Sequence, residues 1–186
     1  MADATTPATD TAEALRDIEA IKQLKARYCR HLDAKDWVSW RTLFADDFVS
    51  ELAVTGGRRR LGADAFMAYT RGTLGKPSQC TIHHVHAPEI TLTSTTTARG
   101  VCAMTDLVRL LPAVTLHGYG HYHETYEKRD GQWRISSSRL TRLREDIALP
   151  GIRVLPPRVA KRLRIAAAKL ARRTSDAFDN HDGKVK

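Results

Sequence analysis

The chain has 186 residues, 42% of them hydrophobic, which is enough for one domain with a buried core and too few for two. Its polar N-terminus lacks the apolar run of a signal peptide, and no stretch nears the about 18 apolar residues that span a membrane, so we expect a cytoplasmic protein without stable membrane insertion. The net charge of +9 belongs mainly to residues 151–186, which carry ten Lys and Arg against three Asp and leave the rest close to neutral, so we expect no nucleic-acid partner.

The first predicted element is a long helix within residues 17–37. Its apolar side chains recur at intervals of three and four residues, as in an amphipathic helix. These side chains are Ile18, Ile21, Leu24, Tyr28 and Leu32. The end of the helix carries Tyr28 and Asp33, both capable of proton chemistry. Because five residues place them on different faces of an ideal helix, they converge only if the helix ends or bends near Leu32. From the residues alone, Tyr28 can equally be plain core and Asp33 a surface carboxylate.

Two shorter helices and a strand pair are predicted next. The helices cover residues 36–44 and 62–72, and the strands cover residues 48–54 and 58–60. Asp36 is expected to cap the first of these helices. Gly72 and Pro77 are expected to close the second one.

The pattern then changes to long segments rich in β-branched and aromatic residues. Four strands are predicted, at roughly residues 79–92, 97–111, 114–128 and 132–144. Helices followed by a run of strands indicate an α+β fold with a mainly antiparallel sheet, strongly curved into a cone that three helices cover. We expect a flexible N-terminus over residues 1–12, the cone domain over 13–148, and a basic C-terminal helix with a disordered tail over 149–186.

Among the candidate functional residues, the histidines of the first long strand can be sorted by alternation. If Thr81, His83 and Val85 face inward, then His84 and His86 face outward, so only His83 can line a pocket. His83 can also be one of several structural histidines. Clustered histidines mark functional sites only statistically.

A carboxylate in an apolar strand segment is a second candidate. Asp106 lies among apolar neighbours, where an ionised group is costly unless it is paired. Arg142 can be its partner if both face the inside of the cone; otherwise Arg142 belongs to a solvated strand face, and the residues alone leave both possibilities open.

Several classes of site are not indicated. Cys29, Cys80 and Cys102 are widely separated and lack metal-ligand spacing, which is typical of reduced, buried thiols. No phosphate-binding loop and no Gly-x-Ser-x-Gly nucleophile motif occur. We therefore expect neither a metal nor a cofactor.

The order of these features resembles the SnoaL-like, or nuclear-transport-factor-like, superfamily. Within it the chain most resembles the bile acid 7-alpha-dehydratases, and it is also similar to scytalone dehydratase. The resemblance covers about residues 15–145 and rests on 17–28, His83, 86–90, 95–98, Asp106 and 126–133. It implies catalytic roles for Tyr28, Asp33, His83, Asp106 and Arg142. Residues 54–61 and everything after Asp146 do not match that pattern.

The resemblance implies a cofactor-free dehydratase that removes water from a hydroxylated steroid-like or polycyclic ketone. His83 would be the base, Asp33 would orient it, and Tyr28 would donate a hydrogen bond to a substrate oxygen. An isomerase or polyketide cyclase has a pocket with similar lining residues and is one alternative. A non-catalytic small-molecule-binding module is a further alternative. The resemblance also implies a homodimer or homotrimer.

The basic helix predicted within residues 158–173 has three possible roles. It can be a lid or oligomer contact, which we favour, or a helix that lies on a membrane surface. It can also be a clamp for an anionic substrate such as a coenzyme A thioester.

Overall fold

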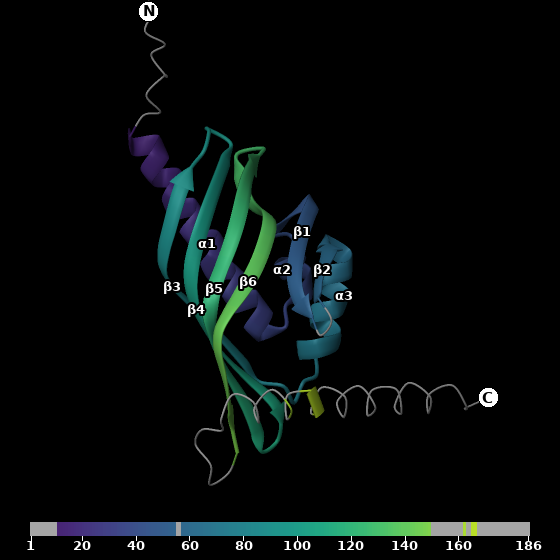
Figure 1. Ribbon diagram of the computed structural model, residues 1–186. Helices are drawn as coiled ribbons and strands as arrows, with labels where there is room; N and C mark the ends of the chain where they lie inside the picture. Colours follow the sequence, from purple (N-terminus) through teal and green to yellow (C-terminus); the bar gives the residue numbers. More distant parts are fainter. Residues whose placement is uncertain (1–10, 55–56, 150–161, 163–164, 167–186) are drawn as a thin grey trace, which may run out of the picture.

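The computed structural model describes residues 11–54, 57–149, 162 and 165–166 (Figure 1). Within these ranges the chain forms three helices and one six-stranded sheet. The helices are α1 (Thr11–Ala34), α2 (Trp37–Arg41) and α3 (Ala63–Leu74). The strands are β1 (Phe44–Val54), β2 (Gly57–Gly62), β3 (Thr81–Leu92), β4 (Thr97–Leu111), β5 (Val114–Arg129) and β6 (Gln132–Ala148).

The sheet has the strand order β2-β1-β6-β5-β4-β3. The β1–β6 pair is parallel, and the other neighbouring strands, which follow one another in the chain, pair antiparallel. Helix α1 runs behind β3 to β6, and α2 and α3 lie beside β1 and β2 (Figure 1). The structure confirms the predicted α+β class with a mainly antiparallel sheet.

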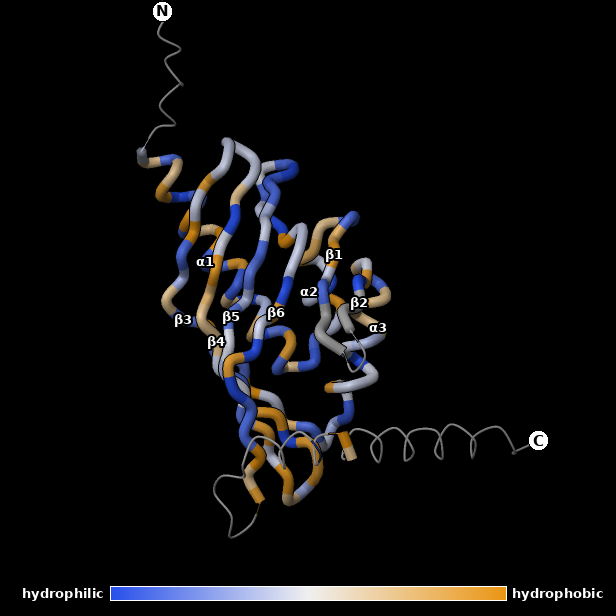
Figure 2. The backbone as a smooth tube through the Cα atoms, in the orientation of Figure 1, coloured by the Kyte–Doolittle hydropathy of each residue, from blue (hydrophilic) through white to orange (hydrophobic). Residues whose placement is uncertain are grey.

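One face of the long strands is buried and the other is open. Along β4 every second residue from Ala98 to Val108 is buried, and β5 repeats this pattern from Leu116 to Tyr126. Figure 2 shows polar and apolar residues mixed along these strands; the two-residue period is one of burial. We call the face that packs against α1 the inner face. Candidate residues can act together only if their side chains all lie on this inner face.

Aromatic side chains form the centre of the core between α1, β1 and α3. Trp40, Phe44, Phe48 and Phe66 are each at most 7% exposed, and their rings contact one another at centroid distances of 4.5 to 5.8 Å. Such edge-to-face and tilted pairs add about 0.5–1.5 kcal/mol each beyond the burial of apolar area. This cluster fixes the end of α1, where the first two candidate residues lie.

The predicted end of the third helix differs from the observed one. Helix α3 passes through Gly72 and ends at Leu74, where the N–H of Gly75 bonds the carbonyl of Arg71, because packing outweighs the low helix propensity of one glycine. The predicted N-cap is confirmed, since the Asp36 carboxylate accepts a hydrogen bond from the backbone N–H of Ser39 at 3.1 Å.

The described helices include none that is both long and apolar enough to cross a membrane. The predicted basic C-terminal helix lies almost entirely outside the described residues. Of the predicted flexible N-terminus, 1–12, residues 1–10 also lie outside them, and Thr11 and Ala12 form the start of α1.

Candidate active site

The end of α1 brings Asp33 to the inner face of β3. The Asp33 carboxylate accepts a hydrogen bond of 2.6 Å from His83 Nδ1 and one of 2.8 Å from the His83 backbone N–H. Helix α1 ends one residue later, at Ala34, and Lys35 has a φ of 60°. The turn that ends the helix therefore lets Asp33 reach the sheet, while Tyr28 points into the core.

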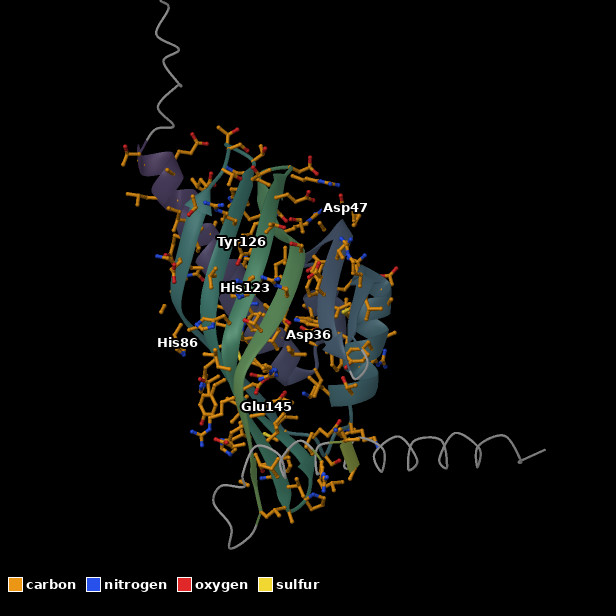
Figure 3. The ribbon with its side chains drawn as sticks, in the orientation of Figure 1. Asp36, Asp47, His86, His123, Tyr126 and Glu145 are labelled. Carbon is orange, nitrogen blue, oxygen red and sulfur yellow. The ribbon has the colours of Figure 1, made fainter. Side chains whose placement is uncertain are left out.

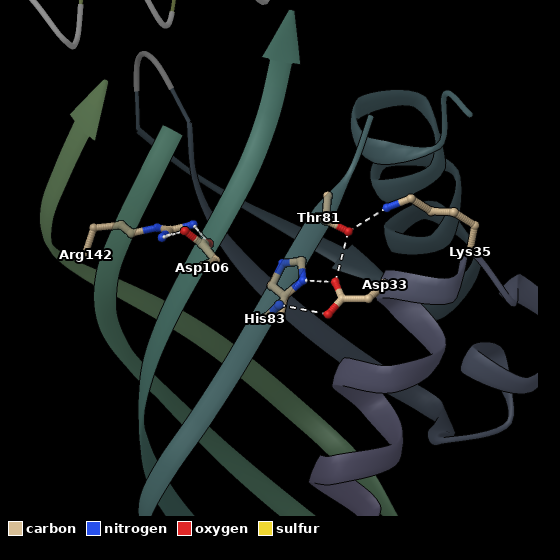
Figure 4. Close-up of polar contacts among 6 residues, drawn as sticks. All are labelled: Asp33, Lys35, Thr81, His83, Asp106 and Arg142. Atoms are coloured by element: carbon tan, nitrogen blue, oxygen red, sulfur yellow. Dashed lines mark hydrogen bonds and ion pairs between the residues drawn. The ribbon is translucent and has the colours of Figure 1, made fainter. Parts of the chain in front are cut away.

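Two further side chains extend this dyad (Figure 4). The Thr81 hydroxyl donates to Asp33 Oδ1 at 2.9 Å, and Lys35 Nζ donates to the Thr81 oxygen at 2.6 Å. Burial raises the pKa of the Asp33 carboxyl, but the hydrogen bonds from His83 and Thr81 outweigh this effect and hold the pKa below its usual value. Asp33 is therefore ionised at neutral pH.

The ionised carboxylate selects the tautomer of His83. A proton on Nδ1 donates to Asp33, which leaves the lone pair of Nε2 available. Within the described residues, Nε2 has no hydrogen-bond partner. His83 is 7% exposed, as expected for an inward-facing residue, whereas its neighbours His84 and His86 are exposed. The dyad thus holds an oriented imidazole with one free nitrogen, the arrangement of a general base.

Asp106 and Arg142 form an ion pair on the same face. Arg142 Nη1 donates to Oδ1 at 2.9 Å and Nη2 donates to Oδ2 at 2.5 Å, so the contact is bidentate. Asp106 is 2% exposed, and the Arg142 side chain is 27% exposed. The carboxylate in the apolar strand is therefore paired, which settles the alternative that the sequence left open.

Two local features make room for this pair. A β-bulge shifts the β5–β6 register, so that Gly120 opposes Arg142 while Tyr119 opposes Arg144. The additional residue turns Arg142 onto the inner face. A Cβ at Gly118 would lie 1.9 Å from Arg142 Nη1 and 2.2 Å from Asp106 Oδ1, so the ion pair occupies the space that a side chain at Gly118 would need.

Register places the dyad and the ion pair next to each other. His83 on β3 pairs directly with Asp106 on β4, and Asp106 pairs with Gly118 on β5, over which the Arg142 guanidinium lies. We call this set, with Asp33, the dyad row. Asp33, with a side chain 25% exposed, and Arg142 are its more accessible members.

Tyr28 lies in the aromatic core next to Tyr122. The two rings are 5.9 Å apart, and Tyr28 also packs against Trp40 and Phe44. Burial raises the pKa of Tyr28 well above its usual value, and the neighbouring Tyr122 adds to this effect. Tyr28 is 3% exposed and stays a neutral phenol, which can donate a hydrogen bond but cannot act as a base at neutral pH.

Tyr122, which packs against Tyr28, also senses the charges of the ion pair. Burial raises the pKa of Tyr122, and its hydroxyl also interacts electrostatically with Arg142 and Asp106. The five residues that the sequence proposes thus form two pairs, Asp33–His83 and Asp106–Arg142, and a tyrosine that packs against Tyr122.

The sequence interpretation missed three residues of this region: Lys35, Lys25 and Glu124. Lys25 Nζ lies 2.6 Å from Glu124 Oε1, and both side chains are at most 3% exposed. The same ammonium lies 3.9 Å from the ring centre of Tyr28 and 3.6 Å from that of Tyr122. The only signal in the sequence is that Lys25 falls one position after Leu24 in the apolar stripe.

The other polar candidates agree with plain structural roles. Cys29 and Cys102 are buried as predicted, whereas Cys80 is exposed. Burial raises the pKa of the Cys29 thiol to about 11, which makes it a poor nucleophile at neutral pH. His123 lies on the open face of the sheet (Figure 3) and contacts Thr141 at 3.0 Å. No group of three or more His, Cys, Asp and Glu in the described ranges is arranged to hold a metal ion.

Comparison with known protein families gives one match over most of the folded part. Residues 13–139 match the sequence model of a SnoaL-like domain. This range contains all candidate residues except Arg142.

Solved structures of similar fold include three with comparable overlap. A protein from Novosphingobium aromaticivorans, provisionally named scytalone dehydratase, is 26% identical, with a TM-score of 0.66 over 73% of this chain and 89% of its own. A hexachlorocyclohexane dehydrochlorinase, LinA-type3 from Novosphingobium barchaimii, is 19% identical, with a TM-score of 0.64 over 78% and 99%. A Mycobacterium tuberculosis protein of unknown function is 24% identical, with a TM-score of 0.65 over 92% and 96%. The last two likenesses bear on the fold alone.

Proposed function

The chain belongs to the SnoaL-like domain family, and on this premise we propose that it is a cofactor-free dehydratase acting on a hydroxylated steroid-like or polycyclic ketone. The observation that carries the proposal is the dyad: His83 Nδ1 is held at 2.6 Å by an ionised Asp33, and Nε2 has no partner among the described residues. The likeness to a provisionally named scytalone dehydratase supports a water-eliminating reaction.

The first step is removal of a proton from a carbon next to the substrate carbonyl. His83 Nε2 takes this proton, and the electron pair of the broken C–H bond moves into the carbonyl to form an enolate. Asp33 stabilises the imidazolium that results and keeps its ring in place, as the short Nδ1 contact requires.

The enolate oxygen needs a hydrogen-bond donor that keeps its proton. Tyr28 fits this role, because its raised pKa makes it a donor rather than a base. The Asp106–Arg142 pair supplies a polar wall of fixed geometry beside the imidazole.

The second step expels the hydroxyl group. The enolate collapses to a conjugated carbon–carbon double bond, the C–O bond breaks, and the imidazolium of His83 returns its proton so that water leaves. One C–H bond and one C–O bond are broken, and no electrons are exchanged with another reagent. The base of the first step is the acid of the second.

The test is to incubate the protein with a panel of hydroxylated steroid-like and polycyclic ketones, both free and as coenzyme A thioesters. Loss of one water is followed by mass spectrometry. Turnover of at least one substrate is expected, with a decrease of about 10²- to 10⁴-fold in His83→Ala. An isomerase or a cyclase that loses no water would give a product of unchanged mass, which would contradict the dehydratase assignment.

The matched control is His84→Ala. His84 is the next residue of β3, has the same side chain, and is exposed on the opposite face. It should keep wild-type turnover. Equal losses in the two variants would show that His83 is not the base.

A further inference from the structure

A cavity lies in the seam between α1 and β3, outside the dyad row. Its volume is about 150 Å³. Ile21, Cys102 and Tyr126 form its floor and are buried, and Val85 and Ile90 form its half-buried walls. We call this cavity the side pocket. Its exposed surface is overwhelmingly apolar.

The floor of the side pocket is held by buried polar contacts. The hydroxyl of Tyr126 donates to Glu124 at 2.8 Å, and Lys25 Nζ donates to the same carboxylate at 2.6 Å. Ser138 adds a third hydrogen bond at 3.0 Å. Because Glu124 satisfies the ammonium of Lys25, that residue contributes its aliphatic chain as wall. Lys22 also lines the cavity, but its side chain is 44% exposed and its ammonium lies 3.5 Å from Glu19.

A strained bulge forms the outer side of the side pocket. The β3–β4 register shifts between His86 and Glu89, and Ala87 in this bulge has a φ of 47°. A residue with a Cβ rarely adopts this conformation, which costs about 1–3 kcal/mol and persists only where the surroundings impose it. His86 and Pro88 line the pocket from the bulge, and Figure 3 shows His86 at the β3 edge of the molecule.

The same segment, residues 86–90, is one of the stretches that carry the family resemblance, yet the dyad row does not use it. Three of its five residues line the side pocket: His86, Pro88 and Ile90. The strained backbone and this motif therefore coincide at one cavity.

We propose that the side pocket binds one small neutral ring compound, aromatic or alicyclic and about the size of benzene. An apolar cavity of about 150 Å³ is large enough for benzene, as an engineered cavity of that size in another protein shows. A charged ligand is disfavoured by its desolvation cost, because the two ammonium groups of the lining already have carboxylate partners, Lys25 with Glu124 and Lys22 with Glu19. This inference does not depend on the dehydratase reaction.

The test is a titration of the full-length protein with benzene, followed by the methyl signals of Ile and Val in ¹H–¹³C NMR spectra. The methyls of Ile21, Val85 and Ile90 should shift and saturate together as one site. Those of Ile135 and Ile147, both fully buried elsewhere, should stay in place. Linear shifts without saturation, or saturating shifts at Ile135 or Ile147 instead, would overturn the proposal and leave the cavity as a packing void.

Two variants locate the site. Cys102→Leu fills the cavity from its floor and should abolish the saturable shifts. Val101→Leu introduces the same residue type at the neighbouring position, on the opposite face, and should leave them intact. If Cys102→Leu does not fold, Ile90→Phe replaces it as a filler from the wall. Wild-type binding in a folded filler variant would overturn the assignment.

Benzoate tests the chemistry of the ligand. It has the same ring with one negative charge, and it should bind at least tenfold more weakly than benzene. Tighter binding of benzoate would mean that Lys25 or Lys22 makes an anion site, which contradicts the neutral ligand proposed. Turnover plays no part in these readouts, so failure of the dehydratase assignment would leave them unaffected.

Discussion

Asp33 accepts hydrogen bonds from the side chain and the backbone of His83 and from Thr81. A carboxylate that accepts several bonds is stabilised in its charged form, which is why the pKa of Asp33 lies below the usual value despite partial burial. At the scale of single residues, this one side chain therefore couples the orientation of the base to the stability of the fold.

Asp33→Asn should make this coupling visible. A group whose folded-state pKa is lowered stabilises the protein above its unfolded-state pKa, and that contribution disappears as the pH falls through the folded value. The variant should thus unfold more easily than wild type at pH 7, and the difference should shrink below about pH 4. Urea denaturation at several pH values measures it. A difference that stays constant from pH 7 to pH 3 would show that charge is not the cause.

Tyr28 and His83 show what single residues in the sequence can indicate. Alternation along β3 correctly predicts that Thr81 and His83 face inward. The apolar stripe places Tyr28 in the core, but it gives no indication of Tyr122, its partner on β5. Contacts between residues so far apart in the chain depend on tertiary packing, which local periodicity does not determine.

At the scale of elements, β5 contributes to the site by having a glycine, with no side chain, where the ion pair lies. Gly118 leaves the space that the Asp106–Arg142 pair fills, and the bulge opposite Gly120 turns Arg142 inward. The sequence predicts the strands but neither the bulge nor the register, so it leaves the pairing of Asp106 open. One inserted residue decides which face an arginine occupies.

Gly118→Ala should displace the guanidinium and destabilise the protein by about 1–3 kcal/mol, as overpacking of a filled site does. Chemical denaturation measures the change in the free energy of unfolding. Gly72→Ala is the matched control, because its Cβ would meet nothing within 4 Å. Because Gly72 lies in the last turn of α3, the substitution should stabilise by no more than about 0.5–1 kcal/mol. Similar effects of both substitutions would contradict the steric account.

Helix α1 is attached to β5 by the buried Lys25–Glu124 pair. Lys25→Met leaves Glu124 unpaired and should cost about 3–5 kcal/mol, whereas Lys25→Met combined with Glu124→Gln removes both charges and should recover much of the loss. The free energy of unfolding is again the measurement. Lys22→Met, at a side chain that is 44% exposed, should change it by less than about 0.5 kcal/mol. A double variant no more stable than Lys25→Met alone would argue against the pair.

At the scale of the whole molecule, the order of helices and strands could be predicted from the sequence because each has a clear period and a turn signal at its end. The Asp130–Gly131 turn is an example: both residues have positive φ, 52° and 74°. The packing of the sheet around α1 follows from the single buried face of each strand. The parallel β1–β6 pairing joins distant segments, and no local pattern predicts it.

The charge of the molecule is divided between the folded part and residues 151–186. Deleting those residues lowers the net charge from +9 to +2. Because all proposed catalytic residues lie between Tyr28 and Arg142, the truncated protein should keep its turnover while it elutes earlier from a cation exchanger. Kinetics and chromatography of both forms measure this. Loss of turnover in a folded truncated protein would assign an essential role to the basic segment.

The central claim is that His83, oriented by Asp33, removes a proton from carbon. The most direct measurement is NMR-detected exchange of the hydrogens next to the carbonyl of a ketone substrate in D₂O. Wild type should introduce deuterium at the position that loses its proton, His84→Ala should do the same, and His83→Ala should be slower by about 10²- to 10⁴-fold. Exchange at the wild-type rate in His83→Ala would contradict the account.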